Sequence, residues 1–344
     1  GSGAWKREVH SFWVDGDNTV TNDVEIRYCS ATGYLSEGIK VAWDSADIKV
    51  RIHHNMIKGD GSLTTRRQNG IQINYGVTVD SISDNTISDL VCRQGGMNWS
   101  TGIGIIKVKP GALIKNNDIS NCDFGIINAF NSEVSVIGNN MTGSGHNYGT
   151  GIYMDNGQAN ITDALIEGNT IGNGFNLGGI CVQGWYPNGH SVGATITNNV
   201  LISDSISDSF GIFDWSGAGQ VTATISGNVI EGWEDGIYLE DGAPVSGYKI
   251  ENNSIKGNTG YNINNKVTTG TLDATCNWYG TAVASVVASK ISGSVTYSPY
   301  LVDGTDSDPA MSGFQPVSGS CSGTPVVVTL SSKTDVSCHG AYTG

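Results

Sequence analysis

The stretch SISDNTI, residues 81–87, contains the pattern that indicates the fold, because this pattern returns along most of the 344-residue chain. In each copy apolar residues alternate with polar ones, and an Asn, any residue and usually an apolar residue follow. The copies are RIHHNMI (51–57), SISDNTI (81–87), LIKNNDI (113–119), VIGNNMT (136–142), LIEGNTI (165–171), TITNNVL (195–201), TISGNVI (224–230) and KIENNSI (249–255). Self-similarity at a nearly fixed spacing is typical of repeat architectures.

One Asn of each copy is predicted to hold the same place in its repeat. The predicted series is Asn55, Asn85, Asn117, Asn140, Asn169, Asn199, Asn228 and Asn253, closed by Asn277, with successive gaps of 30, 32, 23, 29, 30, 29, 25 and 24 residues. Each repeat is therefore one structural unit of roughly 23 to 32 residues.

A second marker, a Gly followed by alternating apolar residues, accompanies each Asn. It occurs as GIKV (Gly38), GIQI (Gly70), GIGI (Gly102), GIIN (Gly125), GIYM (Gly151), GICV (Gly179), GIFD (Gly211), GIYL (Gly236) and GYNI (Gly260). The period-two alternation at both markers predicts two short strands per unit. No segment between them has the pattern of an amphipathic helix of ten or more residues, and the units are too short for propeller blades.

The composition agrees with a chain that turns often. It contains 48 Gly and 31 Asn, which favour turns and disfavour helix interiors. There is no Gly-X-Y period, so collagen is excluded, and 38% hydrophobic against 15% charged residues argues against disorder.

One architecture satisfies both markers: a coil in which each unit is one turn and equivalent strands of successive turns pair in parallel. The rule for parallel crossovers predicts a right-handed coil. The recurrent Asn side chains would stack into a ladder, because an amide can both donate and accept along the stack. About ten turns would make a rod of roughly 45 Å.

The paired I-x-x-N-x-I and GIxI units, over about residues 19–301, resemble the right-handed parallel β-helix with PbH1-type repeats, the pectate-lyase-like fold. The resemblance implies an all-β solenoid in a secreted bacterial protein. It does not imply one function, because this fold hosts lyases, hydrolases, epimerases, phage spikes and adhesins. The segment from Cys276 to Leu301 resembles the closing module of such proteins, so we expect the β-helix domain to span residues 1–301.

The composition changes after this domain. No Asn follows Asn277, and four of the seven Pro lie in the last 46 residues. We interpret residues 302–323 as a linker, and residues 324–344 resemble the start of an SprB-type repeat, which occurs in large surface proteins of Bacteroidota. The resemblance implies a cell-surface protein with further domains in the same polypeptide.

The net charge of −14 argues against nucleic acid as a partner, because phosphate binding depends on clustered Lys and Arg. No stretch approaches the roughly 20 apolar residues of a membrane-spanning helix, so membrane insertion is not expected. The seven Cys contain no CxxC pair, which argues against a zinc or redox site, and an odd number cannot all pair within the chain.

Residues two and four places after each marker Gly should point outward and form two stripes along the rod. The first stripe runs Lys40, Gln72, Gly104, Ile127, Tyr153, Cys181, Phe213, Tyr238, Asn262, and the second runs Ala42, Asn74, Ile106, Ala129, Asp155, Gln183, Trp215, Glu240, Asn264. Aromatic rings and carboxylates in the second half are typical of sugar-binding surfaces. The candidate ligand-binding residues are Tyr153, Asp155, Gln183, Trp185, Phe213, Trp215, Tyr238 and Glu240, with Trp185 contributed by a neighbouring loop. The same stripes are also what well-packed ladders on a parallel sheet produce, so a purely structural role stays open.

If the protein is an enzyme, the candidate catalytic pair is Asp214 and Glu240, from adjacent turns. Hydrolysis needs two carboxyls about 5 to 9.5 Å apart, and Asp214 occupies an inward position unless the register slips. A lyase acting on an acidic polysaccharide would instead need a base such as Lys40, Arg51, Arg66, Arg67, Arg93, Lys107, His53 or His54. If the alternation holds, one of the two His faces inward.

No metal-binding motif or cofactor is expected, although calcium is possible in the acidic loops Val14 to Asp23 and Val302 to Pro309. The sequence therefore favours a secreted or surface-displayed module that binds a polysaccharide or cell-surface glycan, or acts in adhesion. The alternatives are a polysaccharide lyase or glycoside hydrolase, and a structural spacer that binds nothing.

Overall fold

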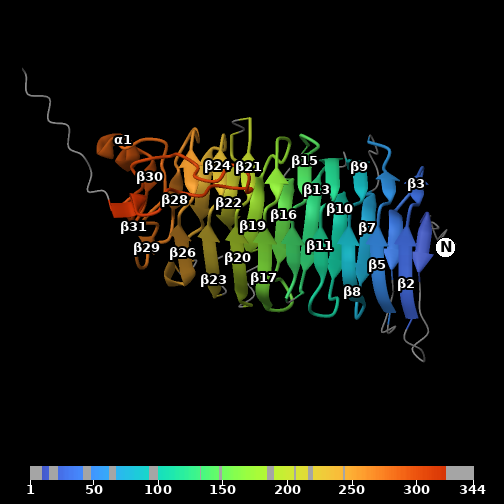
Figure 1. Cartoon of the computed structure of the whole chain (residues 1–344). Helices are drawn as coiled ribbons and strands as arrows, with labels where there is room; N and C mark the ends of the chain where they lie inside the picture. The colour runs from blue at the N-terminus through green and yellow to red at the C-terminus, as the bar shows by residue number, and fades with distance from the viewer. Residues whose placement is uncertain are drawn as a thin grey trace, which may run out of the picture.

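The computed structural model describes residues 10–14, 22–41, 48–61, 67–92, 100–131, 133–146, 149–183, 190–204, 207–215, 220–242 and 245–322. The chain forms a rod of stacked coils, with the blue N-terminal coils at one end and the orange C-terminal coils at the other (Figure 1). Successive coils pair in parallel, as Ile103 does with Ile71 of the preceding coil and with Ile126 of the following one. The predicted all-β parallel β-helix is confirmed.

Each coil contributes to three sheets, whereas the repeats predict two strands per unit. Sheet A comprises β1 (Phe12–Val14), β4 (Glu37–Val41), β7 (Asn69–Asn74), β10 (Thr101–Ile106), β13 (Phe124–Ala129), β16 (Thr150–Asp155), β19 (Gly178–Gln183), β22 (Phe210–Asp214), β25 (Asp235–Leu239), β28 (Ile263–Asn265) and β30 (Ile291–Ser292). Sheet B comprises β2 (Asn22–Arg27), β5 (Ile48–His53), β8 (Thr78–Ser83), β11 (Leu113–Lys115), β14 (Ser135–Ile137), β17 (Ile161–Glu167), β20 (Val192–Thr197), β23 (Val221–Ser226) and β26 (Tyr248–Glu251). Sheet C comprises β3 (Ser30–Thr32), β6 (Met56–Lys58), β9 (Thr86–Leu90), β12 (Asp118–Cys122), β15 (Asn140–Gly143), β18 (Thr170–Ile171), β21 (Val200–Ile202), β24 (Val229–Glu231) and β27 (Ser254–Lys256).

The extra strand arises because the residue before each ladder Asn has a positive φ, which ends one strand and turns the chain into the next. Nine such residues have φ between +53° and +68°: His54, Asp84, Asn116, Gly138, Gly168, Asn198, Gly227, Asn252 and Cys276. Tyr28, before Cys29 in the first coil, has the same conformation, with a φ of +54°. Gly, Asn and Asp predominate there, since they tolerate the left-handed region best. The I-x-x-N-x-I unit thus contains a strand of sheet B, a turn and a strand of sheet C.

The Asn ladder is present and satisfies its amides on both sides. Asn169, for example, accepts hydrogen bonds from the backbone N of Asn139 (2.9 Å) and its Nδ2 (3.0 Å). Its own Nδ2 donates to the carbonyl of Val136 and to Oδ1 of Asn199, both at 2.9 Å. Equivalent bonds connect the nine ladder Asn from Asn55 to Asn277 in eight steps. The ladder is thus shorter than the ten or so turns predicted, although sheet A extends beyond both ends of the ladder.

The assignment of Asn140 to the ladder is wrong. Asn139 occupies the rung, buried to 1% exposure, and Asn140 is exposed. The cause is the register: Val136, not Ile137, pairs with Ile114 and Ile166 as the inward residue. Gly138 then takes the positive φ, and the rung falls three places after Val136.

The marker Gly has a steric role. A Cβ on Gly151 would lie 2.6 Å from Cγ2 of Ile171 and 2.7 Å from the carbonyl oxygen of Gly179, the marker of the next coil. The same contact joins each marker from Gly38 to Gly211 to the one after it. A side chain is therefore excluded where sheet A meets sheet C, and the residue before the Gly points outward.

The assignment of Gly260 as the last marker Gly is wrong. The carbonyl of Asn262, not that of Gly260, approaches Gly236 in the next coil, and Tyr238 pairs with Asn264. The outward stripe therefore ends at Asn264 rather than at Asn262. In this coil β28 (Ile263–Asn265) begins directly after Asn262, and Asn262 stands where the earlier coils have the marker Gly.

The rod ends in a short cap that includes β29 (Leu272–Asp273), β31 (Val295–Thr296) and the single turn of helix α1 (Ala284–Ser289). Two 3-10 turns, η1 (Val245–Gly247) and η2 (Ser320–Ser322), complete the described elements. Lys290, directly after α1, donates through Nζ to the carbonyls of Asn258, Thr259 and Gly260 at 2.9 to 3.2 Å. This contact joins the cap to the last coils.

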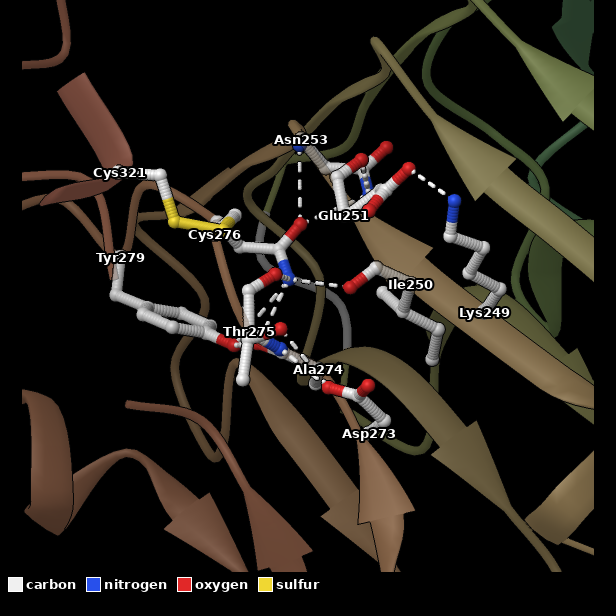
Figure 2. Close-up of a disulfide and its surroundings, with 11 residues drawn as sticks. Lys249, Ile250, Glu251, Asn253, Asp273, Ala274, Thr275, Cys276, Tyr279 and Cys321 are labelled. Atoms are coloured by element: carbon white, nitrogen blue, oxygen red, sulfur yellow. Dashed lines mark hydrogen bonds and ion pairs between the residues drawn. A yellow bond between two sulfur atoms is a disulfide. The ribbon is translucent and has the colours of Figure 1, made fainter. Parts of the chain in front are cut away.

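Residues 302–322, interpreted above as part of a linker, pack back along the coils; we call them the strap. The backbone N of Phe314 donates to the carbonyl of Gly227 at 2.7 Å, and the Phe314 side chain is buried. The strap ends at a disulfide between Cys276 and Cys321 (Figure 2), beside the last rungs of the ladder at Asn253. Between strap and coils lies a cavity of about 460 Å³.

We expect Cys321→Ser to release the strap while leaving the coil folded. The disulfide closes a 45-residue separation, and without it mainly Phe314 and a few backbone bonds hold the strap. Chymotryptic cleavage after Phe314 should become at least about tenfold faster, since it requires undocking. Cys29→Ser, at a half-buried free Cys, is the matched control and should not change the rate. Equal cleavage rates in all three proteins would contradict this prediction.

Candidate functional site

The outward stripe predicted from the marker Gly is formed by register on sheet A. Tyr153 pairs with Cys181, Cys181 with Phe213, and Phe213 with Tyr238. A second outward row lies one place before each marker Gly, where Phe124 and Phe210 stand. Strict alternation through the Gly does not predict this second row, because the chain bends at the Gly.

Most of the outer face of sheet A is buried. In the N-terminal coils it is polar, and Nε2 of Gln72 donates to Oδ1 of Asn74 at 2.8 Å. In the middle coils an apolar cluster lies outside the coil, separate from the main core. Its buried members are Phe124, Tyr153, Leu177, Cys181 and Phe213, and Ile127, Phe210, Trp215 and Tyr238 pack against it while remaining partly exposed.

Two predicted ligand-binding residues therefore support the surface rather than form it. Tyr153 is 7% exposed and Phe213 only 1%. The ring of Tyr153 meets Phe124 edge-on with centroids 5.9 Å apart, and Phe213 meets Trp215 edge-on at 5.5 Å. The second contact holds Trp215, which is partly exposed.

The partly exposed residues Phe210, Trp215, Tyr238 and Glu240, which we call the platform, form the candidate site. The rings of Phe210 and Tyr238 stack with centroids 4.4 Å apart, and Phe210 also contacts the ring of Phe213, with centroids 5.5 Å apart. The Tyr238 hydroxyl donates to Oε2 of Glu240 at 2.8 Å. Burial, and then this bond to a carboxylate, raise the pKa of Tyr238, which stays a neutral donor. The set offers aromatic faces and an acceptor, as sugar-binding sites do.

The structure does not bring the carboxyls of Asp214 and Glu240 to the same side of sheet A. Asp214 is fully buried, and its Oδ2 accepts a hydrogen bond from the hydroxyl of Tyr248, a core residue, at 2.6 Å. Burial followed by the charge of Asp214 raises the pKa of Tyr248 well above its ordinary value. Glu240 lies on the outer face beside Tyr238. The register also slips, because Gln183 pairs with Asp214 and not with Trp215.

The remaining predicted site residues are placed as follows. Asp155 ends β16 and is partly buried, with Oδ1 accepting from the backbone N of Gly157 at 2.8 Å. Gln183 ends β19, but its side chain is outside the described residues, as is all of Trp185.

Burial raises the pKa of Asp155, although the bond from Gly157 acts in the opposite direction. Ionising this carboxyl therefore costs more in the folded state than in the unfolded one. The cost is absent below its unfolded pKa of about 3.9, grows as the pH rises through that value, and is complete above the raised pKa.

We therefore expect Asp155→Asn to raise the melting temperature at pH 7 by about 1–2 °C and to leave it unchanged at pH 3. The Asn keeps an oxygen for Gly157, so the packing is preserved. Thermal unfolding followed by circular dichroism at pH 3, 5 and 7 measures the difference. A gain that is the same at every pH would contradict the assigned cause.

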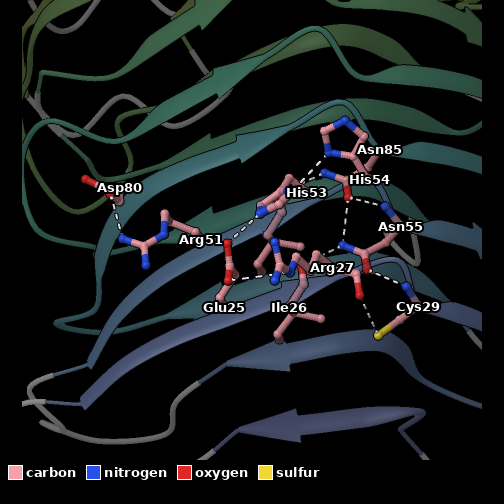
Figure 3. Close-up of polar contacts among 11 residues, drawn as sticks. Glu25, Ile26, Arg27, Cys29, Arg51, His53, His54, Asn55, Asp80 and Asn85 are labelled. Atoms are coloured by element: carbon pink, nitrogen blue, oxygen red, sulfur yellow. Dashed lines mark hydrogen bonds and ion pairs between the residues drawn. The ribbon is translucent and has the colours of Figure 1, made fainter.

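Five of the basic residues considered for a lyase have partners in the described structure: Lys40, Arg51, His53, His54 and Lys107. Neither His53 nor His54 faces inward, contrary to the expectation for one of them, because the positive φ at His54 turns both onto the outside (Figure 3). Nε2 of His53 lies 2.9 Å from Oε1 of Glu25, and Nδ1 lies 2.9 Å from Nδ1 of His54. The bond from His53 lowers the pKa of Glu25. Arg51 pairs with Asp80 at 3.5 Å.

Two further candidates are also engaged. Nζ of Lys40 lies 3.9 Å from Oε2 of Glu37. Lys107 lies over the ring of Tyr75, 5.6 Å from its centroid. Arg67 is exposed. Arg66 and Arg93 lie outside the described residues.

The acidic loop Val302 to Pro309 satisfies its own backbone. Oδ1 of Asp303 accepts from the N and Oγ1 of Thr305, which lowers the pKa of this carboxyl. Oδ1 of Asp306 accepts from the N of Asp308 and of Gln315. Most of the other loop, Val14 to Asp23, is outside the described residues. In the described ranges, no three His, Cys, Asp or Glu are grouped to hold a metal ion.

The described part of the chain also contains no helix that is long and apolar enough to cross a membrane. Comparison with protein-family models, with curated proteins and with solved structures finds no match for this chain.

Proposed function

We propose that this chain is an extracellular or cell-surface β-helix module of a larger bacterial protein, and that it binds carbohydrate, or acts in adhesion, through the platform. The observation that carries the proposal is the stacked pair Phe210 and Tyr238 beside the carboxylate of Glu240, all partly exposed. Sugars stack their apolar faces on such rings while carboxylates accept bonds from their hydroxyls.

The rigidity of the platform supports this function. Phe213 and Cys181 are buried beneath it, and strands β22 and β25 hold the residues in register. A site whose side chains are already fixed loses less conformational entropy on binding.

The disulfide between Cys276 and Cys321 supports a location outside the cytoplasm, because disulfides persist in oxidising compartments.

The enzymatic alternatives receive less support. Hydrolysis needs two carboxyls facing one substrate, and Asp214 faces the core while Glu240 faces outward. The third alternative, a structural spacer that binds nothing, is distinguished from a carbohydrate-binding module by the glycan-binding experiment below.

We expect a glycan array to give a ligand for the full chain, and Trp215→Ala to reduce binding to it by about tenfold or more, as expected for loss of an aromatic contact. The melting temperature of the variant should stay within a few degrees of the unmodified protein. No binding to any glycan would support the spacer. Catalysis is tested in parallel by assaying for new reducing ends and unsaturated uronates. If turnover is found and Glu240→Gln or Asp214→Asn abolishes it, the protein is an enzyme and the proposed binding function is wrong.

A further inference from the structure

The negative charge of the chain is concentrated in the coils that carry the platform. Residues 116–248 contain 14 Asp and Glu and no Lys or Arg. The net charge of −14 arises there, since the 18 acidic residues elsewhere equal the 18 Lys and Arg. His146 and His190 are the only residues of this stretch that can become positively charged on the side chain.

Many of these carboxylates are exposed to solvent, among them Asp118, Glu133, Asp163, Asp204, Asp208 and Asp241. Lys256 of a later coil reaches Glu231, with Nζ 3.7 Å from Oε2. A surface of one sign raises the local concentration of oppositely charged ligands and repels ligands of its own sign.

Glu240 has a carboxylate oxygen available for a ligand. Oε2 accepts from Tyr238, but among the described residues no hydrogen bond or ion pair to Oε1 is formed. Lys266 follows in the next coil, where its backbone N donates to the carbonyl of Leu239 at 2.9 Å. Its side chain is exposed, and no ion pair joins it to Glu240 within the described structure.

Asp155 is a second carboxyl on the same outer face. It lies three coils before Glu240 in the order β16, β19, β22, β25, which corresponds to roughly 14 Å. The bond from the Gly157 N–H satisfies only its Oδ1. A cation placed here would offset the desolvation of this carboxylate.

We infer that the ligand of the platform is a glycan with free amino groups, an amino-sugar polymer whose amines are protonated. This inference rests on the proposed binding function and specifies its ligand class. An ammonium beside an aromatic face and a carboxylate gains from both, through cation–π attraction and a charge-assisted hydrogen bond. Residues 116–248 contain no Lys or Arg that could neutralise the carboxylates of a uronate polymer. The acidic surface therefore repels such a polymer.

The test measures binding of three matched hexasaccharides to the full chain by titration calorimetry at pH 6. They are hexamers of glucosamine, of N-acetylglucosamine and of galacturonate. We expect the glucosamine hexamer to bind at least about tenfold more tightly than the N-acetylated one, which corresponds to one favourable charge contact. We expect the galacturonate hexamer not to bind.

Variants of this chain assign the charge contact. Glu240→Gln should weaken glucosamine binding about tenfold while changing binding of the N-acetylated hexamer little. Lys266→Ala should strengthen glucosamine binding, because it removes a cation of the next coil that competes for Glu240. Asp163→Asn is the matched control: it neutralises an exposed carboxylate of the same acidic coils on sheet B and should have no effect.

The outcomes separate the inference from the proposed function. If none of the hexamers and no other glycan binds, both fail. If the N-acetylated hexamer binds as tightly as the amine, or the galacturonate hexamer binds best, carbohydrate binding stands and the amine inference is overturned. Equal losses from Glu240→Gln and Asp163→Asn, or equally tight binding of a hexalysine peptide, would also overturn it, because they indicate unspecific attraction of cations.

Discussion

Asn139→Ala is expected to lower the free energy of unfolding by about 3–5 kcal/mol, whereas Asn140→Ala should change it by less than about 0.5 kcal/mol. Asn139 accepts from the N and Nδ2 of Asn117 and donates to the carbonyl of Ile114 and to Oδ1 of Asn169. Removing its amide leaves these buried groups without partners, and the ladder is interrupted in its middle.

Asn140 is a matched control, since it has the same side chain one residue later. It is exposed, and its Nδ2 donates only to Oδ1 of Asp118, at 3.2 Å, in the described structure. Guanidinium unfolding monitored by circular dichroism gives both values. A larger loss for Asn140→Ala than for Asn139→Ala would show that the register assigned to this coil is incorrect.

Gly151→Ala is expected to destabilise the protein by about 3 kcal/mol or more. The new methyl group would meet Cγ2 of Ile171 at 2.6 Å and the carbonyl oxygen of Gly179 at 2.7 Å. That carbonyl belongs to the backbone of the next coil, which is held by sheet pairing on both sides and cannot move away by itself. The strain must therefore spread to neighbouring coils.

Gly172→Ala provides the comparison. A Cβ at Gly172 would find its nearest neighbour, Cγ2 of Thr142, at 3.4 Å, which is an ordinary contact, and the backbone there needs no positive φ. Its melting temperature should stay within about 1–2 °C of the unmodified protein. If both Ala variants unfold together with the unmodified protein, the marker Gly does not have the steric role assigned to it.

Much of the architecture was predictable because every coil of a solenoid has the same local structure and requires the same residue types at the same positions. The recurrent Asn predicts the ladder, and the recurrent Gly marks sheet A, since each position meets its own copy in the next turn. The errors occurred where the pattern is ambiguous. VIGNNMT contains two adjacent Asn, and only the pairing of Val136 with Ile114 shows that Asn139 is the rung. An added condition, a residue tolerant of positive φ before the rung, would have favoured Asn139 through Gly138.

The candidate site was less predictable. The alternation of residues predicts which side chains of sheet A point outward. It does not predict which of these outward side chains are buried by their neighbours. Tyr153 and Phe213 resemble ligand-binding residues in the sequence and are buried supports in the structure. Phe210 was not selected because it precedes a marker Gly, and the bend there is visible only once sheets A and C are in place.

One recurrent Asn and one recurrent Gly per coil are enough to predict a parallel β-helix with an Asn ladder, because ladder and core depend on residues that recur at one position per coil. The folded chain was needed to show which outer residues are accessible and which carboxyls share a side of the sheet. Those properties depend on register slips such as the one at Gln183 and on contacts between coils. The return of the strap onto the coil also required the structure, because the contacts of Phe314 and Cys321 join segments far apart in the chain and follow no repeat.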